Sequence, residues 1–331
     1  MTEHFSATAR ACSNIAFIKY WGNKDHDLRI PINGSISMNL KGLETTTSVF
    51  FSDRYSPDRL VLNGEEGSQA AVERVSRHLD HIRKLAGISL CAAVESKNNF
   101  PTGAGIASSA SAFSALTAAA CHALELDLTE REMTTIARLG SGSAARSIPG
   151  GFVEWYAGAD HKSSYAESIA PADHWELVDH VAIVSLEHKA VGSSGGHRLA
   201  DTSTLNPGRI EDVPRRLALC REAILARDFA ALADVSEKDT LLMHSVMMTS
   251  EPALFYCLPP TLAVMQAVRE WRADGVPVFF TIDAGPNVHV ITTGDYAEEI
   301  RERLEAITGV IEVLSATPGG SVEIVEQDSQ K

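Results

Sequence analysis

The sequence has few basic residues and no long apolar run. Its 331 residues include 29 Lys and Arg against 43 Asp and Glu, which gives a formal net charge of −14. This surplus of negative charge argues against nonspecific binding to nucleic acid or to an anionic membrane. The sequence contains neither a signal-peptide core nor a stretch of about eighteen apolar residues. We therefore predict a cytoplasmic protein whose basic residues gather locally where an anion binds.

The cysteines and histidines show none of the common metal-binding spacings. No Cys-x-x-Cys or His-Glu-x-x-His pattern occurs, and the one close histidine pair is His78 and His81. A solvated helix face explains that pair better than zinc does. The cysteines are odd in number and widely separated in the sequence, which favours reduced thiols in the core over a disulfide framework. They are Cys12, Cys91, Cys121, Cys220 and Cys257.

The composition is that of an ordinary globular protein. Hydrophobic residues make up 44% of the chain and charged residues 22%, and a chain of this length favours two domains. We place these domains at 1–175 and 176–331, and expect the glycine-rich segment 192–197 to be mobile.

The periodicity predicts an α+β fold, with helices on a mostly antiparallel sheet in the second half. Predicted strands cover 45–51, 59–63, 91–95, 151–155, 181–186, 276–283, 288–292 and 309–314; predicted helices cover 71–85, 111–124, 130–139, 213–227, 229–248, 260–274 and 298–307.

A glycine-rich turn at 100–110 (FPTGAGIASSA) leads into an alanine-rich helix. Free backbone N–H groups and the positive end of the helix dipole bind phosphate at such a helix start. Ser108 and Ser109 add hydroxyl donors or Mg²⁺ ligands. The spacing matches neither Gly-x-x-x-x-Gly-Lys-Ser/Thr nor Gly-x-Gly-x-x-Gly, which weakens the P-loop and Rossmann interpretations. A packing turn before a core helix is the alternative.

Four polar residues stand where isolated polar groups are unusual. Asn14 and Lys19 flank an apolar run, and a buried ammonium requires an anionic partner. Arg146 lies among small residues and suits a carboxylate or phosphate. Asp283 follows the apolar run VPVFFTI and suits a general base. The alternatives are a lysine extending to solvent, a surface arginine at a helix cap and an Asx turn.

Four segments taken together identify a family. In chain order they are NIAFIKYWG, NNFPTGAGIASSAS, RLGSGSAARSIPGGFVEW and TIDAGPN. They closely resemble the mevalonate diphosphate decarboxylases of the GHMP kinase superfamily, over about residues 9–290.

The resemblance implies a two-domain GHMP kinase fold, with a ribosomal protein S5 domain 2-like N-terminal domain and a ferredoxin-like C-terminal domain. It also implies a homodimer and an ATP- and Mg²⁺-dependent reaction. In that reaction the 3-hydroxyl of the substrate is phosphorylated, and phosphate and CO₂ then leave.

The resemblance also implies roles for individual residues. Asp283 would orient or deprotonate the 3-hydroxyl, Arg146 would hold the substrate carboxylate, and Lys19 would tune Asp283 and the transferred phosphoryl group. The implied substrate-binding residues are Asn14, Tyr20, Asn23, Lys24, Arg74, Ser141, Ser143 and Ser193; those implied for ATP are Gly103, Ala104, Gly105, Ser108, Ser109 and Lys189, with Ser108 also a Mg²⁺ ligand.

The sequence departs from the family at Asn23, where the family usually has a lysine that faces the substrate diphosphate. Loss of a charge-assisted partner costs about 1.5 to 3 kcal/mol. Arg74, which matches a family arginine for the same group, is retained. We therefore predict mevalonate 5-phosphate slightly ahead of mevalonate 5-diphosphate as the substrate. Alternatively, Lys24 takes the place of the missing lysine, or Asn23 suffices.

Two other functions use the same motifs. One is a GHMP kinase that phosphorylates mevalonate or a phosphomevalonate at the 3-hydroxyl and stops. The other is a nucleotide-binding protein without catalysis. The presence of Arg146 and Asp283 argues against the kinase, because a carboxylate clamp serves decarboxylation. The presence of Lys19, Arg146 and Asp283 argues against the non-catalytic protein, which would not need all three.

Overall fold

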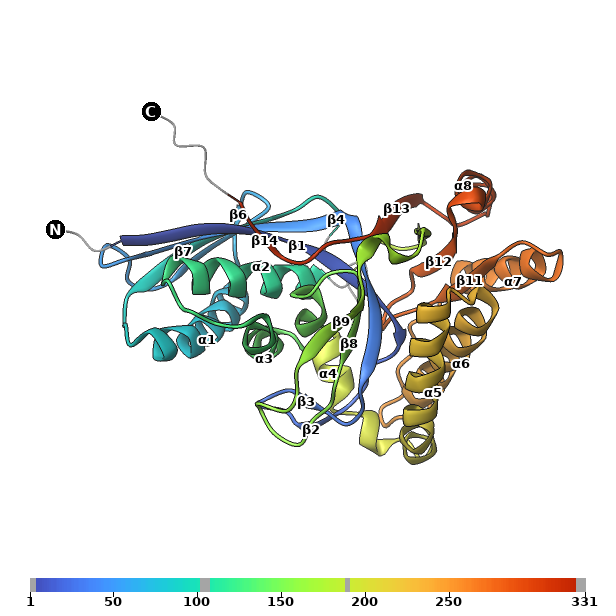
Figure 1. Cartoon of the computed structure of the whole chain (residues 1–331), viewed down its shortest axis with the longest axis horizontal. Coiled ribbons are helices and arrows are strands. Elements are labelled where there is room, and N and C mark those ends of the chain that lie inside the picture. Colours follow the sequence, from blue (N-terminus) through green and yellow to red (C-terminus); the bar gives the residue numbers. More distant parts are fainter. Residues whose placement is uncertain (1–3, 102–107, 188–190, 326–331) are drawn as a thin grey trace.

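One sheet runs through both halves of the molecule. The computed structural model describes residues 4–101, 108–187 and 191–325, and within them twelve strands are connected into a single sheet (Figure 1). Its longest members are β1 (His4–Ile18) and β4 (Ser35–Ser52), which pair antiparallel along most of their length. Helices cover this sheet in separate groups, so the predicted α+β fold class is confirmed.

Three helices cover one face of the sheet in the N-terminal half (Figure 1). Helix α2 packs directly on β1 and β4, and its buried face is made largely of alanine, which allows close approach. Helix α3 begins with the predicted capping box, in which Thr129 and Glu132 each accept the other's backbone N–H. The bounds are α1 Gln69–Ala86, α2 Ser108–Ala123, α3 Glu130–Gly140, η1 Gly142–Ser147, β5 Arg59–Leu62, β6 Glu65–Glu66, β7 Cys91–Asn98, β8 Phe152–Trp155 and β9 Ala166–Ala170.

The C-terminal half is an antiparallel sheet of order β11-β12-β10-β13 with helices packed beside it. Helices α5 and α6 lie against each other and against the sheet (Figure 1). The bounds are β10 Leu177–Ile183, β11 Val278–Thr281, β12 Val288–Thr293, β13 Glu312–Pro318, α4 Ser193–His197, α5 Asn206–Ala226, α6 Phe229–Met248, α7 Pro259–Ala273 and α8 Ala297–Glu305, with η2 Ala172–His174, η3 Ala200–Thr202 and η4 Gly294–Tyr296 as short 3₁₀ turns.

The end of the described chain returns to the N-terminal half. Strand β13 pairs with β4 at Thr317 and Pro318, and β14 (Glu323–Val325) then pairs antiparallel with β1. Gly319 extends this contact, because its N–H donates to Asn39 O at 2.9 Å. A division into domains at 1–175 and 176–331 stays a prediction, and in space the last strand lies with the first half.

Several predicted elements need correction. Strand β1 was not predicted, because it is buried along most of its length and shows no alternation of polar and apolar residues. Segment 192–197, expected to be mobile or ligand-dependent, contains the one-turn helix α4, and its His197 is buried, whereas its mobility stays a prediction. Helix α5 begins seven residues earlier than predicted, at Asn206.

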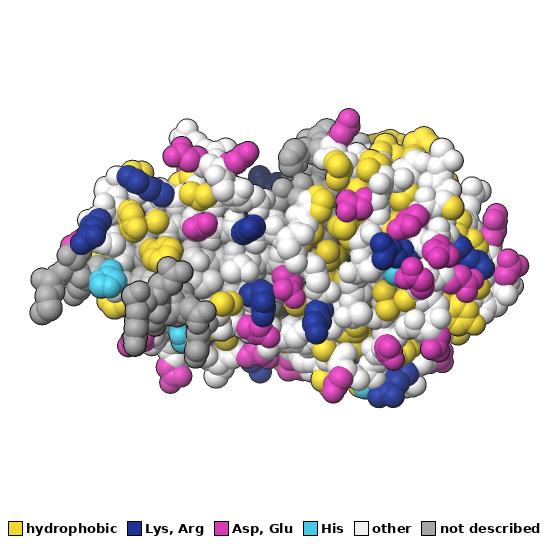
Figure 2. Space-filling model, turned by 90° about the horizontal axis from the view of Figure 1, so that it is seen from above, with side chains coloured by type: hydrophobic (Ala, Val, Ile, Leu, Met, Phe, Trp, Pro, Cys, Tyr) yellow, Lys and Arg dark blue, Asp and Glu magenta, His cyan; other side chains and the backbone are white. Residues whose placement is uncertain are grey.

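The structure also bears on the surface charge, the absence of long apolar segments and the state of the cysteines. On the face seen in Figure 2, Lys and Arg side chains are scattered among acidic ones. None of the helices in the described part of the chain is both long and apolar enough to cross a membrane. All five cysteines are free thiols, and Cys12, Cys121 and Cys220 are buried, whereas Cys91 and Cys257 are only partly buried.

Candidate active site

A cavity of about 250 Å³ lies where residues from both halves of the chain meet. Its walls come from the end of β1, the start of α2, the α3–η1 junction, α4 and the segment after β11. Nine of the residues predicted for the site line it, namely Lys19, Tyr20, Arg74, Ser109, Ser141, Ser143, Arg146, Ser193 and Asp283.

Lys19 and Asp283, which both line this cavity, form an ion pair. Each follows a strand directly or within two residues, Lys19 after β1 and Asp283 after β11, and Lys19 Nζ donates to Asp283 Oδ1 at 2.6 Å. The side chain of Lys19 is 2% exposed and that of Asp283 is 27% exposed. Burial lowers the pKa of Lys19. Burial also opposes ionisation of Asp283, but the charge and hydrogen bond of Lys19 outweigh it and hold the Asp283 pKa below its usual range.

Arg146 is buried in the η1 turn and makes no ion pair with another described residue. Its Nη1 donates to Ser35 Oγ at 2.7 Å and its Nη2 to Asn14 Oδ1 at 3.1 Å, whereas its Nε has no partner within the described structure. Burial lowers the Arg146 pKa to about 10, so the side chain stays charged at neutral pH. A buried, charged and under-bonded guanidinium at a cavity wall suits an anionic group. We call Lys19, Arg146 and Asp283 the central triplet.

Asn14 acts behind the cavity wall. Its Oδ1 accepts from Arg146, and its Nδ2 donates to Ser147 Oγ at 2.8 Å and to Ser143 O at 3.1 Å. Asn14 is buried and does not belong to the cavity lining. It therefore orients Arg146 and the η1 turn.

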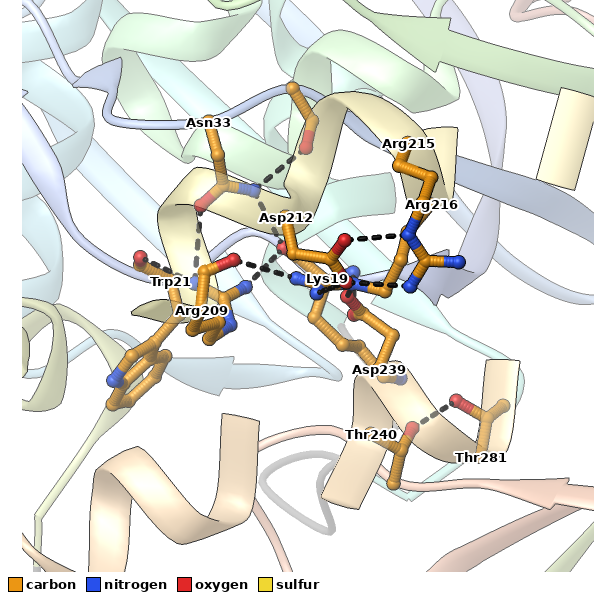
Figure 3. Close-up of polar contacts among 11 residues, drawn as sticks. Lys19, Trp21, Asn33, Arg209, Asp212, Arg215, Arg216, Asp239, Thr240 and Thr281 are labelled. Carbon is orange, nitrogen blue, oxygen red and sulfur yellow. Dashed lines mark hydrogen bonds and ion pairs between the residues drawn. The ribbon is translucent and has the colours of Figure 1, made fainter. Parts of the chain in front are cut away.

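A buried polar network holds the backbone of Lys19 (Figure 3). The Asp239 carboxylate on α6 accepts the Lys19 N–H at 2.6 Å and Arg216 Nε at 2.8 Å. On the other side of the residue, Lys19 O accepts from Arg209 Nη2 at 2.7 Å and from Asn33 Nδ2 at 2.9 Å. Both backbone polar groups of Lys19 are thus fixed from α5, α6 and the segment before β4.

Tyr20 is held on several sides. Its ring stacks on His197 with centroids 4.1 Å apart and meets the edge of Trp155 at 4.7 Å. A Cβ at Gly142 would come within 2.5 Å of this ring, so glycine is required there. The Tyr20 hydroxyl donates to Asn23 Oδ1 at 2.6 Å, and burial raises the Tyr20 pKa to about 12.

Asn23 and Lys24, two residues predicted to contact substrate, do not line the cavity. Asn23 is buried and accepts from Tyr20. Lys24 is exposed, and its Nζ donates to Gly158 O. Among the lining residues that the sequence interpretation did not name are Arg29 and His197. Arg29 stands in a polar turn after Asp25, and this turn gives no sequence signal that the side chain faces the cavity.

The predicted phosphate loop is only partly described. Ser109 Oγ lies 3.1 Å from Ser141 Oγ, which lies 3.4 Å from Ser143 Oγ, so three hydroxyls line one wall. Ser108 is the first residue of α2 and is not part of the lining. No group of three or more His, Cys, Asp or Glu side chains that could hold a metal ion occurs among the described residues. The remaining predicted residues, Gly103, Ala104, Gly105 and Lys189, lie outside the described residues.

Comparison with known proteins places this arrangement in a family. Residues 11–166 match the diphosphomevalonate decarboxylase-like N-terminal domain, and residues 180–327 match the mevalonate 5-diphosphate decarboxylase C-terminal domain. The human diphosphomevalonate decarboxylase is 38% identical over 319 residues, which cover 89% of this chain and 78% of the human one. The phosphomevalonate decarboxylase of Haloferax volcanii is 32% identical over 323 residues, covering 97% and 98% of the two chains.

A solved structure described as a complex with MVAPP, AMPPCP and magnesium has the same fold. It is 37% identical, the match covers 98% of this chain and 100% of the other, and the TM-score is 0.92. The match therefore includes both halves of the chain and the cavity between them. This chain belongs to the mevalonate diphosphate decarboxylase family, ATP-dependent carboxy-lyases of the GHMP kinase superfamily.

Proposed function

We propose that this enzyme uses ATP to phosphorylate the 3-hydroxyl of mevalonate 5-phosphate and then releases phosphate and CO₂, leaving isopentenyl phosphate. The observation that carries the decarboxylation is the central triplet: an ionised Asp283 paired with Lys19 at 2.6 Å, beside a buried Arg146 that has no carboxylate partner among the described residues. These groups match the substituents of a 3-hydroxy acid, whose hydroxyl-bearing carbon and carboxylate carbon are two bonds apart.

Each member of the central triplet has one task. Asp283 accepts a hydrogen bond from the 3-hydroxyl and orients its oxygen toward the γ-phosphoryl group of ATP. Lys19 keeps Asp283 ionised and stabilises charge on the transferred phosphoryl group. Arg146 holds the substrate carboxylate. When the C3–O bond breaks and phosphate leaves, the electrons of the bond to the carboxylate form the new C=C bond, and CO₂ departs.

The described residues beside α2 fit the phosphates of a nucleoside triphosphate. Helix α2 presents its N-terminus next to Ser109 and the hydroxyls of Ser141 and Ser143, which can donate to phosphate oxygens. Mg²⁺ in phosphoryl-transfer sites is bound largely by phosphate oxygens and water, with few protein ligands. Ser108, which precedes the lining residue Ser109, is the protein residue that would bind the ion. When bound, the ion neutralises charge on the phosphates.

The choice of the 5-phosphate over the 5-diphosphate rests on Asn23. The lysine that the family usually has at this position is absent, and the Asn23 side chain is engaged with the Tyr20 hydroxyl instead. The Lys24 ammonium is bonded to Gly158 O and exposed to solvent. Both observations favour a substrate that carries a single phosphate group at C5 over one that carries a diphosphate.

The test is to measure ADP release and CO₂ loss with ATP and Mg²⁺, comparing mevalonate, its 5-phosphate and its 5-diphosphate. The proposal expects the highest kcat/KM with the 5-phosphate and one CO₂ for each ADP. Preference for the 5-diphosphate would make Asn23 a tolerated change. ADP release without CO₂ would make the protein a kinase.

We also propose that the enzyme works as a homodimer in the cytoplasm. Both statements come from the family resemblance and from the composition. Light scattering coupled to size-exclusion chromatography would test the first, with a mass close to twice the 35.6 kDa of one chain as the expected result.

A further inference from the structure

Two arginines that line the cavity are held on neighbouring backbone carbonyls. Arg29 Nε donates to Leu139 O at 2.9 Å, and Arg74 Nη2 donates to Gly140 O at 2.9 Å. Both carbonyls belong to the last turn of α3, whose dipole favours cations there. We call Arg29 and Arg74 the arginine pair.

In the part of the chain that the structure describes, the arginine pair lacks a carboxylate counterpart. Neither guanidinium makes an ion pair with any residue in the described ranges. Each has five N–H donors, and Arg74 Nε is buried without a hydrogen-bond partner among the described residues. Two adjacent cations in a partly buried site repel each other. An anion in the cavity would remove that repulsion and satisfy the remaining donors.

The backbone of Arg29 is fixed in an unusual conformation. Its φ is +50°, in the left-handed region that residues with a Cβ seldom adopt. The preceding residue is clamped on both sides, because Leu28 N donates to Asp25 Oδ1 at 2.8 Å and Leu28 O accepts from the buried Arg138 at 3.0 Å. The turn between β2 (Asn23–Asp25) and β3 (Ile30–Pro31) therefore directs Arg29 to the cavity.

We propose that Arg29 is a specificity-determining residue that binds the 5-phosphate of the substrate together with Arg74. This inference rests on the proposed function, since it assigns to the Arg29 guanidinium the binding of the phosphate of a phosphorylated mevalonate. A phosphate monoester carries a charge of about −1.5 to −2 at neutral pH, which two guanidiniums balance. Arg29 thereby takes the role left open by Asn23, and its planar fork suits bidentate contact with phosphate oxygens.

The experiment compares Arg29→Gln, Arg29→Lys and Asn23→Lys with the wild-type enzyme, and uses Arg59→Gln as a charge-matched control. Arg59 is exposed on β5, away from the cavity lining. Steady-state kinetics with the 5-phosphate and the 5-diphosphate give KM and kcat, and calorimetric titration with mevalonate 5-phosphate without ATP gives affinity independently of turnover.

Arg29→Gln is expected to raise KM and Kd for the 5-phosphate roughly 10- to 100-fold, with kcat and the KM for ATP changed less than about threefold. Arg29→Lys should recover part of the affinity, and Asn23→Lys should improve kcat/KM for the 5-diphosphate. An unchanged Kd in Arg29→Gln, or an equal loss in Arg59→Gln, would overturn the role of Arg29. If the wild-type enzyme releases no CO₂ from either substrate, the proposed function fails, and the titration still decides whether Arg29 binds the phosphate.

Discussion

Lys19 and the arginine pair solve the problem of a buried cation in different ways. Lys19 meets a carboxylate from the other half of the chain at 2.6 Å, and its backbone is fixed by Asp239 and Arg209. The hydrogen bonds that the arginine pair makes to other described residues go to two carbonyls at the end of α3, and Arg74 also lies over the Phe113 ring. The geometry around Lys19 is therefore complete within the protein, whereas the arginine pair leaves its charge for a ligand.

This difference separates the chemistry from recognition of the substrate. A group that must act on every substrate of the family needs a fixed position, which buried ion pairs and backbone contacts provide. A group that reads one phosphate needs free donors on a rigid support. Changes at the arginine pair can thus alter specificity while the central triplet stays intact.

The largest effect is expected from Asp283→Asn. The amide cannot accept the hydroxyl proton and cannot balance Lys19, so kcat should fall by about 10² to 10⁴. ATP affinity, measured with a fluorescent analogue, should change little. Asp274→Asn, an exposed carboxylate just before β11, is the control. Residual turnover within about tenfold of the wild type would refute the assigned role of Asp283.

The support of Lys19 can be tested with Asp239→Ala. Asp239 is fully buried, and its removal takes away the acceptor of Arg216 Nε and of the Lys19 N–H, although Arg216 keeps its contact with Asp212. The free energy of unfolding should fall by about 3 to 5 kcal/mol in urea titrations. Asp234→Ala on the same helix removes an ion pair whose two side chains are 65% exposed, and should cost less than about 1 kcal/mol. Equal losses for the two variants would contradict a special role for the network.

Tyr20 lines the cavity together with members of both groups of residues, and Gly142→Ala should disturb its position. The new Cβ would lie 2.5 Å from the Tyr20 ring, which costs about 1 to 3 kcal/mol of stability and displaces the ring. We expect a higher KM for the phosphorylated substrate. Gly208→Ala, where a Cβ meets nothing within 4 Å, is the matched control. A normal KM in Gly142→Ala would show that the position of Tyr20 is unimportant.

The smallest effect concerns pH and the ring beneath Tyr20. Burial lowers the pKa of His197 to about 3 from its ordinary 6.5, and its Nδ1 accepts the Gly22 N–H at 2.9 Å. Below pH 6.5 the unfolded chain binds a proton that the folded state does not, so stability falls as pH decreases from about 6.5 toward 3. The loss from this residue is about 1.4 kcal/mol at pH 5.5.

Urea titrations at pH 7.5 and 5.5 on wild type and His197→Asn measure this loss. The variant should lose less stability between the two pH values, by about 1.4 kcal/mol. The buried His78 and His244, with pKa values lowered to about 3 and about 4, also contribute to the total and are common to both proteins. An identical pH dependence for the two proteins would contradict the neutral state of His197.

The sequence predicted the helices better than the strands. Helix α6 was predicted with its observed bounds, because its start has a capping Asp228 and its apolar residues recur at helical spacing. Strand β1 has no such signal, since it is buried along most of its length and helices α2 and α6 both pack against it. Boundaries of the other strands shifted by a few residues where pairing, which depends on distant segments, decides where a strand ends.

For the site, the sequence identified residues within long motifs and missed those outside them. Lys19, Arg146 and Asp283 were predicted from their motifs, and the structure brings them to one cavity. Arg29 lies eight residues after Trp21 in an ordinary polar turn, and only the β2–β3 hairpin directs it to the cavity. The network around Asp239 joins residues more than 200 positions apart, which periodicity cannot reveal.

The pairing of β14 with β1 sets an order of events during synthesis. Residues of the first half can begin to fold on the ribosome, but one edge of β1 receives its partner only after Val325 has emerged. At about 5 to 20 residues per second, some 150 further residues take about 10 to 30 s. For that time the edge of β1 at Thr8 to Arg10 presents unpaired backbone groups, the kind of exposed strand that chaperones bind and that promotes aggregation when they are absent.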